Sequence, residues 1–95
     1  MTYQNDLVEN LLRNYYSLSA HDDMLFSDYK VDIEAGLRKL HDDSSSLYFT
    51  VISVFVNGTP IQEQAKKERV STRQINRKLH DGLHMLTMIM NGDIL

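Results

Sequence analysis

The sequence contains no cysteine, a single proline and only four glycines among its 95 residues. The absence of cysteine excludes disulfides, thiol chemistry and zinc sites built on thiolates, and it is compatible with a reducing compartment. Glycine and proline are scarce and the hydrophobic fraction is 42%, which indicates a folded chain rather than a disordered one. We therefore expect a folded and mostly helical protein.

Long apolar runs are also missing from the sequence. There is no stretch of about 18 consecutive apolar residues, and the first residues lack the basic and then apolar pattern of a secretory signal. A length of 95 residues fits one domain with a modest core. We expect a single cytoplasmic domain at residues 1–95, with an acidic helical part at 1–43 and a second part at 44–90.

The formal net charge of −3 argues at first against a nucleic-acid partner, because phosphate neutralisation requires a surplus of lysine and arginine. The distribution of the charge changes this interpretation. Residues 1–60 carry nine acidic and four basic side chains, whereas residues 61–95 carry four acidic and six basic ones. The surplus of positive charge therefore lies in the C-terminal part of the chain.

The N-terminal part shows helical periodicity. A helix is predicted at about residues 5–20 because these apolar side chains recur one turn apart: Leu7, Val8, Leu11, Leu12, Tyr15 and Tyr16. Tyr15 and Tyr16 are expected to pack in the core rather than to stack on a partner. A polar stretch at residues 19–23 interrupts the pattern.

A second helix is predicted by the spacing of Ile33, Leu37 and Leu40. Gly36 lies inside this helix and lowers its stability. Residues 41–46, which are acidic and rich in serine, indicate a connection, and one of residues 42–45 is expected to cap the element that follows.

Residues 47–56, LYFTVISVFV, admit two interpretations. Their β-branched and aromatic content is typical of a buried strand. A strand would have to turn at Asn57-Gly58 into a second strand, yet residues 59–68 have neither alternation nor β-forming residues. A helix that is apolar on nearly every face accommodates the run equally well, so we predict an all-α bundle of about five helices.

Two capping boxes mark the starts of the last two helices. Residues 59–62, Thr-Pro-Ile-Gln, combine a capping threonine, a proline in the first helical position and a glutamine three residues after the cap. Residues 71–74, Ser-Thr-Arg-Gln, repeat the box, and Val70 with Ile75 occupies the positions of a hydrophobic staple. These signals predict a short helix, a tight connection and a longer helix at about residues 72–90.

Residues 58–86 contain a set of residues whose types and spacing are similar to those of a helix-turn-helix family: Gly58, Glu63, Ala65, Val70, Ser71, Arg73, Ile75, Arg77, Leu79, Gly82, Leu83 and Leu86. The segment resembles the helix-turn-helix of sigma-70 region 4 and, more closely, the sigma-like regulators of phages and mobile elements that include the ArpU family. The N-terminal half is similar to the small phage members through residues 14–15 and 31–35, with Leu37 and Leu40.

The sequence departs from this pattern at three positions. Family members usually have an apolar residue where Gln64 stands, another where Glu68 stands, and glycine at the turn where Arg69 stands. The contacts between the two helices are expected to be retained by small and apolar residues, namely Ala65, Val70, Ile75 and Leu79.

The resemblance implies DNA binding through the longer helix. At about 100° per residue, one face of this helix is apolar and the opposite face carries Arg73, Arg77, His80 and His84. Its first turns would enter the major groove, so the residues expected at base edges are Thr72, Arg73, Asn76 and Arg77. Phosphate contacts are expected from Lys66, Lys67, Arg69 and Lys78.

Other chemistry finds little support in the sequence. His80 and His84 lie one turn apart, as zinc ligands can, but no third ligand has matching spacing, so both are expected in solvent. No hydrolase, P-loop, dinucleotide or metalloprotease motif is present. We expect no catalytic residue, no metal site and no cofactor.

The predicted function is that of a sigma-like transcription regulator, of phage or mobile-element type, that binds double-stranded promoter DNA. The resemblance further implies contact with RNA polymerase. The alternative is a protein-interaction module that has kept the helix-turn-helix fold and lost DNA contact, which the overall acidity and the three departures favour. Helix-turn-helix proteins often pair to read two half-sites, which favours a homo-oligomer, and no membrane association is expected.

The tail after Leu86 also leaves two interpretations open. Apolar residues at 88–90 cover more than one side of the helix, which favours self-association or partner docking. The alternative is that the tail folds back on the N-terminal helix. Asn91-Gly92 is expected to end the last helix and to leave Ile94 and Leu95 as an apolar end.

Overall fold

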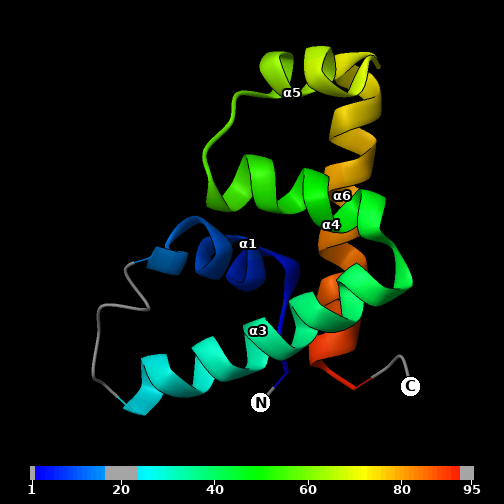
Figure 1. The fold of residues 1–95 in the computed structure, drawn as a ribbon. Helices are drawn as coiled ribbons and strands as arrows, with labels where there is room; N and C mark the ends of the chain where they lie inside the picture. Colours follow the sequence, from blue (N-terminus) through cyan, green and yellow to red (C-terminus); the bar gives the residue numbers. More distant parts are fainter. Residues whose placement is uncertain (1, 17–23, 93–95) are drawn as a thin grey trace.

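The computed structural model describes residues 2–16 and 24–92, with side chains except for those of residues 24–27. All regular structure in these ranges is helical, with no strand, which confirms the predicted all-α fold (Figure 1). The helices in chain order are α1 (Asn5–Arg13), α3 (Met24–Asp43), α4 (Ser45–Val51), the π-helix η1 (Ile52–Val56), α5 (Ile61–Glu68) and α6 (Thr72–Met90).

Helix α6 is the element against which the others pack. In Figure 1 it runs along one side of the molecule, α5 lies across its N-terminal end and α3 crosses it near its C-terminal end. Five residues of its predicted apolar face are buried, namely Ile75, Leu79, Gly82, Leu83 and Leu86, and Thr87 is buried beside them, whereas Met90 of the predicted face is half-buried. The residues predicted on the opposite face are all exposed: Arg73, Arg77, His80 and His84.

Residues 47–56 are helical, as predicted, and form most of α4 and all of η1. The N–H of Asn57 donates to the carbonyl of Ile52, 3.0 Å away, in the wide i to i−5 pattern. The helices α1, α3 and α6 all pack on this segment, so its apolar side chains are covered on several sides. Burial from several directions therefore outweighs the β-propensity of the sequence.

The first helix is shorter than predicted. It ends at Arg13, and the side-chain Nδ2 of Asn14 donates to the carbonyl of Asn10 at 2.7 Å. An asparagine side chain that donates to a carbonyl of the preceding turn competes with the backbone for that acceptor, which accounts for the break. Residues 15–16 are helical again, and the predicted interruption at 19–23 lies outside the described residues.

The two tyrosines that follow this break have different environments. Tyr15 packs against the core and its hydroxyl donates to Glu34 Oε1 at 2.7 Å. Burial and the charge of Glu34 add to this hydrogen bond, and together they raise the pKa of Tyr15 to about 12. Tyr16 is 67% exposed, so the prediction that it packs in the core is wrong.

The connection predicted at residues 41–46 is also wrong, because α3 continues to Asp43 and α4 begins at Ser45. The C-terminal end of α3 is held by contacts that the sequence pattern did not predict. The ring of His41 meets that of Tyr48 edge-on at 4.7 Å, and Lys39 pairs with Asp43 at 3.1 Å. Ser44 occupies the predicted cap position of α4, but its side chain makes no capping hydrogen bond.

Helix α6 ends at Met90, and Gly92 adopts the predicted left-handed conformation with φ of 76°. The Asn91 side chain accepts from the N–H of Tyr3 at 2.6 Å and donates to its carbonyl at 2.9 Å. The described end of the chain is thus bound to its N-terminal segment, whereas Ile94 and Leu95 lie outside the described residues. None of the described helices has the length and apolarity needed to cross a membrane.

Two glycines allow close approach of helices to α6. A Cβ on Gly82 would lie 2.6 Å from Val51 Cγ2, and Val51 is fully buried in α4. A Cβ on Gly36 of α3 would lie 2.9 Å from Leu86 Cδ1 and from Met90 Cγ. The small residue at position 82 therefore sets the distance between α4 and α6.

We expect Gly82→Ala to lower the free energy of unfolding by about 1–3 kcal/mol, because the rigid, buried Val51 has nowhere to move. Gly36→Ala is the matched control and should cost less, because Leu86 and Met90 contact it through flexible side chains. Urea denaturation followed by circular dichroism measures both values. A Gly82→Ala variant as stable as the native chain would contradict this account of the contact.

Candidate nucleic-acid interface

Helix α5, a turn at residues 69–71 and helix α6 follow one another where the sequence predicts them. Arg69 has φ of 59° and ψ of 43°, the left-handed conformation that usually requires glycine. Its N–H bonds to the carbonyl of Lys66 at 3.3 Å, and the N–H of Val70 bonds to that of Ala65 at 3.0 Å. These two bonds form a Schellman motif, which ends α5 and aims the chain into α6.

The capping box predicted at the start of α6 is present. The N–H of Gln74 donates to Ser71 Oγ at 3.1 Å, and the N–H of Ser71 donates back to Gln74 Oε1 at 3.4 Å. Val70 and Ile75 both pack on the core, as a hydrophobic staple requires. The entry angle of α6 is therefore determined by residues on both sides of the turn.

The box predicted at residues 59–62 is wrong. Helix α5 begins at Ile61 with Pro60 in the cap position, and no side chain caps it. The hydroxyl of Thr59 instead lies 3.0 Å from Ser53 Oγ, and the backbone N–H of Thr59 donates to the carbonyl of Ser53 at 3.0 Å. The threonine ties the start of α5 to η1 and is not available as a cap.

Most of the predicted DNA-contacting residues are exposed on α5, the turn and the first half of α6: Lys66, Lys67, Arg69, Thr72, Arg73, Asn76 and Arg77. Arg73, Asn76 and Arg77 share one face of α6, because Asn76 and Arg77 follow Arg73 by three and four residues. Lys67 pairs with Glu63 at 3.7 Å. Four cationic side chains have no ion pair or hydrogen bond to any other described residue: those of Lys66, Arg69, Arg73 and Arg77.

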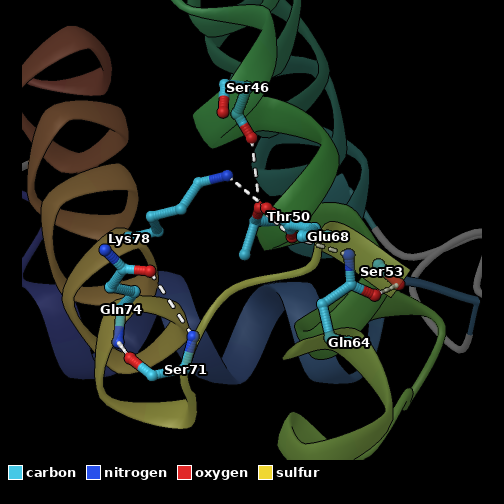
Figure 2. Close-up of polar contacts among 8 residues, drawn as sticks. All are labelled: Ser46, Thr50, Ser53, Gln64, Glu68, Ser71, Gln74 and Lys78. Carbon is cyan, nitrogen blue, oxygen red and sulfur yellow. Dashed lines mark hydrogen bonds and ion pairs between the residues drawn. The ribbon is translucent and has the colours of Figure 1, made fainter. Parts of the chain in front are cut away.

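Lys78, the eighth predicted residue, has a different environment. Its ammonium binds the carboxylate of Glu68, and the two side chains are only 23% and 21% exposed. Glu68 Oε2 also accepts from Thr50 Oγ1 at 2.6 Å and from Gln64 Nε2 at 2.8 Å. Figure 2 shows these side chains converging on Glu68 from α4, α5 and α6. We call these four residues the Glu68 network.

The network extends to η1 through Ser53, whose hydroxyl donates to Gln64 Oε1 at 2.5 Å. No buried side-chain nitrogen or oxygen of the described residues lacks a hydrogen-bond partner. The two polar departures from the family pattern, Gln64 and Glu68, are therefore satisfied inside the protein. The sequence pattern did not predict their partners Thr50 and Lys78, and the one signal that it offers is that each of them stands directly before a buried apolar residue.

The environment of Glu68 affects its protonation. Burial alone would raise the pKa of this carboxyl group, but hydrogen bonds from Lys78, Thr50 and Gln64 and the charge of Lys78 outweigh it. The pKa of Glu68 is therefore held below its ordinary value of 4.5. Glu68 carries its negative charge at neutral pH, and this charge neutralises Lys78.

No three histidine, aspartate or glutamate side chains of the described residues are placed to hold a metal ion. His80 and His84 are exposed, as predicted. Compared with known proteins, the chain matches no family model, no curated protein and no solved structure. Function is therefore inferred from the residues and their geometry.

We expect Glu68→Gln to lower the free energy of unfolding at pH 7 by about 1–3 kcal/mol, because it removes charge-assisted hydrogen bonds. A carboxyl group whose pKa is lower in the folded state stabilises the fold above its unfolded pKa, and this contribution is lost as the pH falls through the folded value. The difference between the two proteins should therefore disappear as the pH falls below 4.5.

Denaturation at a series of pH values between neutrality and strong acid measures this difference. Glu63→Gln is the matched control on the same helix, since the Glu63–Lys67 pair is exposed and should contribute little at any pH. A Glu68→Gln difference that stays constant over the whole series would show that the charge of Glu68 does not stabilise the fold.

Proposed function

We propose that this protein is a DNA-binding transcription regulator in which α6 enters the major groove and α5 crosses the phosphate backbone. One observation carries the proposal. The first turns of α6 present Arg73, Asn76 and Arg77 on one exposed face, while the opposite face of the same helix is buried in the core. A recognition helix needs this combination of free side chains and a fixed backbone.

The exposed side chains suit base recognition. Arginine can donate to both O6 and N7 of guanine, and asparagine can pair with N6 and N7 of adenine. The N–H groups at the start of α6 and the positive end of its dipole favour a phosphate next to Thr72. These residues therefore supply base-edge donors and backbone-binding donors within two turns of one helix.

The charge of this region supports an anionic partner in spite of the net charge of −3. Residues 59–78 contain six basic and two acidic side chains. The acidic ones are Glu63 and Glu68, each paired with a lysine, so the four unpaired cations face solvent. Lys66 and Arg69 are the two of these cations expected at phosphates, and if both make that contact the logarithm of affinity should fall with the logarithm of salt concentration with a slope of about −1.8.

The biological setting follows from the resemblance of residues 58–86 to sigma-70 region 4 and to sigma-like regulators of phages and mobile elements. We include in the proposal a cytoplasmic location, promoter DNA as the target and RNA polymerase as a further partner. Gln64 and Glu68 depart from the family pattern, but the structure gives each of them polar partners. The departures are thus compatible with a packed helix pair.

A protein-interaction module is the second candidate. It is favoured by Phe49, which is 60% exposed and contacts the rings of His41 and Tyr48. An exposed aromatic side chain of this size is suited to a protein partner. This candidate predicts no salt-dependent binding to duplex DNA, which distinguishes it from the first.

We expect Arg73→Ala and Arg77→Ala each to weaken binding to the specific site by about 1–3 kcal/mol and to leave the fold intact. Lys66→Ala should weaken binding to all sequences alike and make the salt slope shallower by about one unit. The specific site is first selected by the native chain from a pool of random duplexes, and affinities are then measured by fluorescence anisotropy.

The control for these substitutions is Arg38→Ala, which removes an exposed arginine of α3. Its binding should equal that of the native chain. If the Arg73 and Arg77 variants also bind like the native chain, α6 does not read the groove. If the native chain selects no sequence and shows no salt-dependent binding, the second candidate function is favoured.

Arg69→Gly should change stability and DNA binding in opposite directions. Glycine relieves the left-handed strain and should raise the free energy of unfolding by about 1 kcal/mol. Loss of the cation should weaken DNA binding and make the salt slope shallower by about one unit. Arg69→Ala removes the same charge without relieving the strain, so it should weaken binding equally and gain no stability. Equal stabilities for the two variants would contradict the strain argument.

A further inference from the structure

Helix α5 has an unusually small apolar contact with the rest of the protein. Its inward positions recur at helical spacing and are Ile61, Gln64, Ala65 and Glu68. Only Ala65 is a buried apolar residue, and Ile61 is half-buried. Half of the inward face of α5 is therefore polar, and its connection to the other helices depends on hydrogen bonds.

The partners of this polar face come from three neighbouring elements. Gln64 binds Ser53 of η1, and Glu68 binds Thr50 of α4 and Lys78 of α6. Thr50 and Lys78 each stand directly before a buried apolar residue of their own helix, Val51 and Leu79. In Figure 2 the side chains of Thr50, Gln64 and Lys78 meet at Glu68, and those of Glu68 and Lys78 are about one fifth exposed.

Hydrogen bonds hold a helix differently from apolar contacts. Apolar contact is non-directional and tolerates sliding or rotation, whereas a hydrogen bond weakens steeply when its angle changes. Replacing a buried ion pair by well-packed apolar residues is often neutral or stabilising. What the Glu68 network contributes beyond stability is therefore a defined geometry.

We propose that Glu68 is a positioning residue that sets the orientation of α5 relative to α6. Because it binds α4 and α6 at once, it fixes α5 in both rotation and translation along its axis. This places Lys66 and Lys67 of α5 at a constant distance from Arg73, Asn76 and Arg77 of α6. The consequence for DNA rests on the proposed function, whereas the orientation of α5 is a property of the protein alone.

The first experiment measures orientation without DNA. Backbone residual dipolar couplings are recorded on the full chain and on Glu68→Leu/Lys78→Met, which replaces the ion pair by apolar residues of similar size. We expect the couplings of α5 in the variant to depart from the native orientation, while those of α3 and of the second half of α6 still fit it. Unchanged α5 couplings would overturn the proposal.

The matched control is Glu63→Leu/Lys67→Met, which makes the same chemical change in the exposed ion pair of α5. Its α5 couplings should remain native. If the Glu68→Leu/Lys78→Met variant does not fold, Glu68→Gln replaces it, since glutamine keeps the size of the side chain and removes its charge and one of its two acceptor oxygens. Native α5 couplings in Glu68→Gln would then overturn the proposal.

The second experiment measures the ratio of specific to non-specific DNA affinity. A purely structural role changes the folded fraction, which scales both affinities alike and leaves their ratio unchanged. A positioning role should lower the ratio about tenfold in Glu68→Leu/Lys78→Met, which is comparable to the loss of one base contact. The Glu63→Leu/Lys67→Met control should keep the ratio, although its phosphate affinity can change.

The outcomes separate the two proposals. If the variant reorients α5 and lowers the ratio, Glu68 positions the DNA interface. If it reorients α5 and leaves the ratio unchanged, the DNA part of the inference is wrong. If the native chain binds no duplex, the proposed function fails, and the couplings alone decide whether Glu68 orients α5.

Discussion

The Glu68 carboxylate is the group on which the arrangement of the last three helices depends. It accepts hydrogen bonds from Thr50, Gln64 and Lys78, so that α4, α5 and α6 meet at one side chain. A carboxylate removed from water requires its donors to remain in place, because the loss of one leaves charge without compensation. Ala65 is the only apolar residue that α5 buries. The position of α5 against α4 and α6 therefore depends on the hydrogen bonds of the Glu68 carboxylate.

Helix α6 serves the core and the proposed interface at the same time. Its inner face carries buried residues such as Ile75 and Leu79, and its outer face carries Arg73, Asn76 and Arg77. Because one backbone supports both faces, the packing of the inner residues determines the direction of the outer ones. Contacts to base edges tolerate little displacement, so a helix held along 19 residues is a suitable platform for them.

The acidity of the chain is compatible with the proposed anionic partner because charges are paired locally. Near the basic residues, Glu63 and Glu68 are each bound by a lysine. The acidic residues of α3 lie in another part of the fold, and salt screens exposed charges beyond about 8 Å under physiological conditions. The charges at the first turns of α6 are therefore those of Arg73 and Arg77, and the exposed acidic residue that follows them in the helix is Asp81, one turn after Arg77.

The helical state of residues 47–56 needed burial by α1, α3 and α6 to outweigh the local β-propensity. Local signals in the sequence determined the buried face of α6 and the capping box at Ser71. Each of these depends on residues a few positions apart, whose relative places any helix fixes in advance. The tertiary structure alone decided which polar groups meet. Thr59 bonds Ser53 rather than capping α5, and Lys78 pairs with Glu68 rather than extending into solvent. Such pairs join different helices, and helical periodicity shows which face of each helix turns inward but not which residues of two inward faces come together.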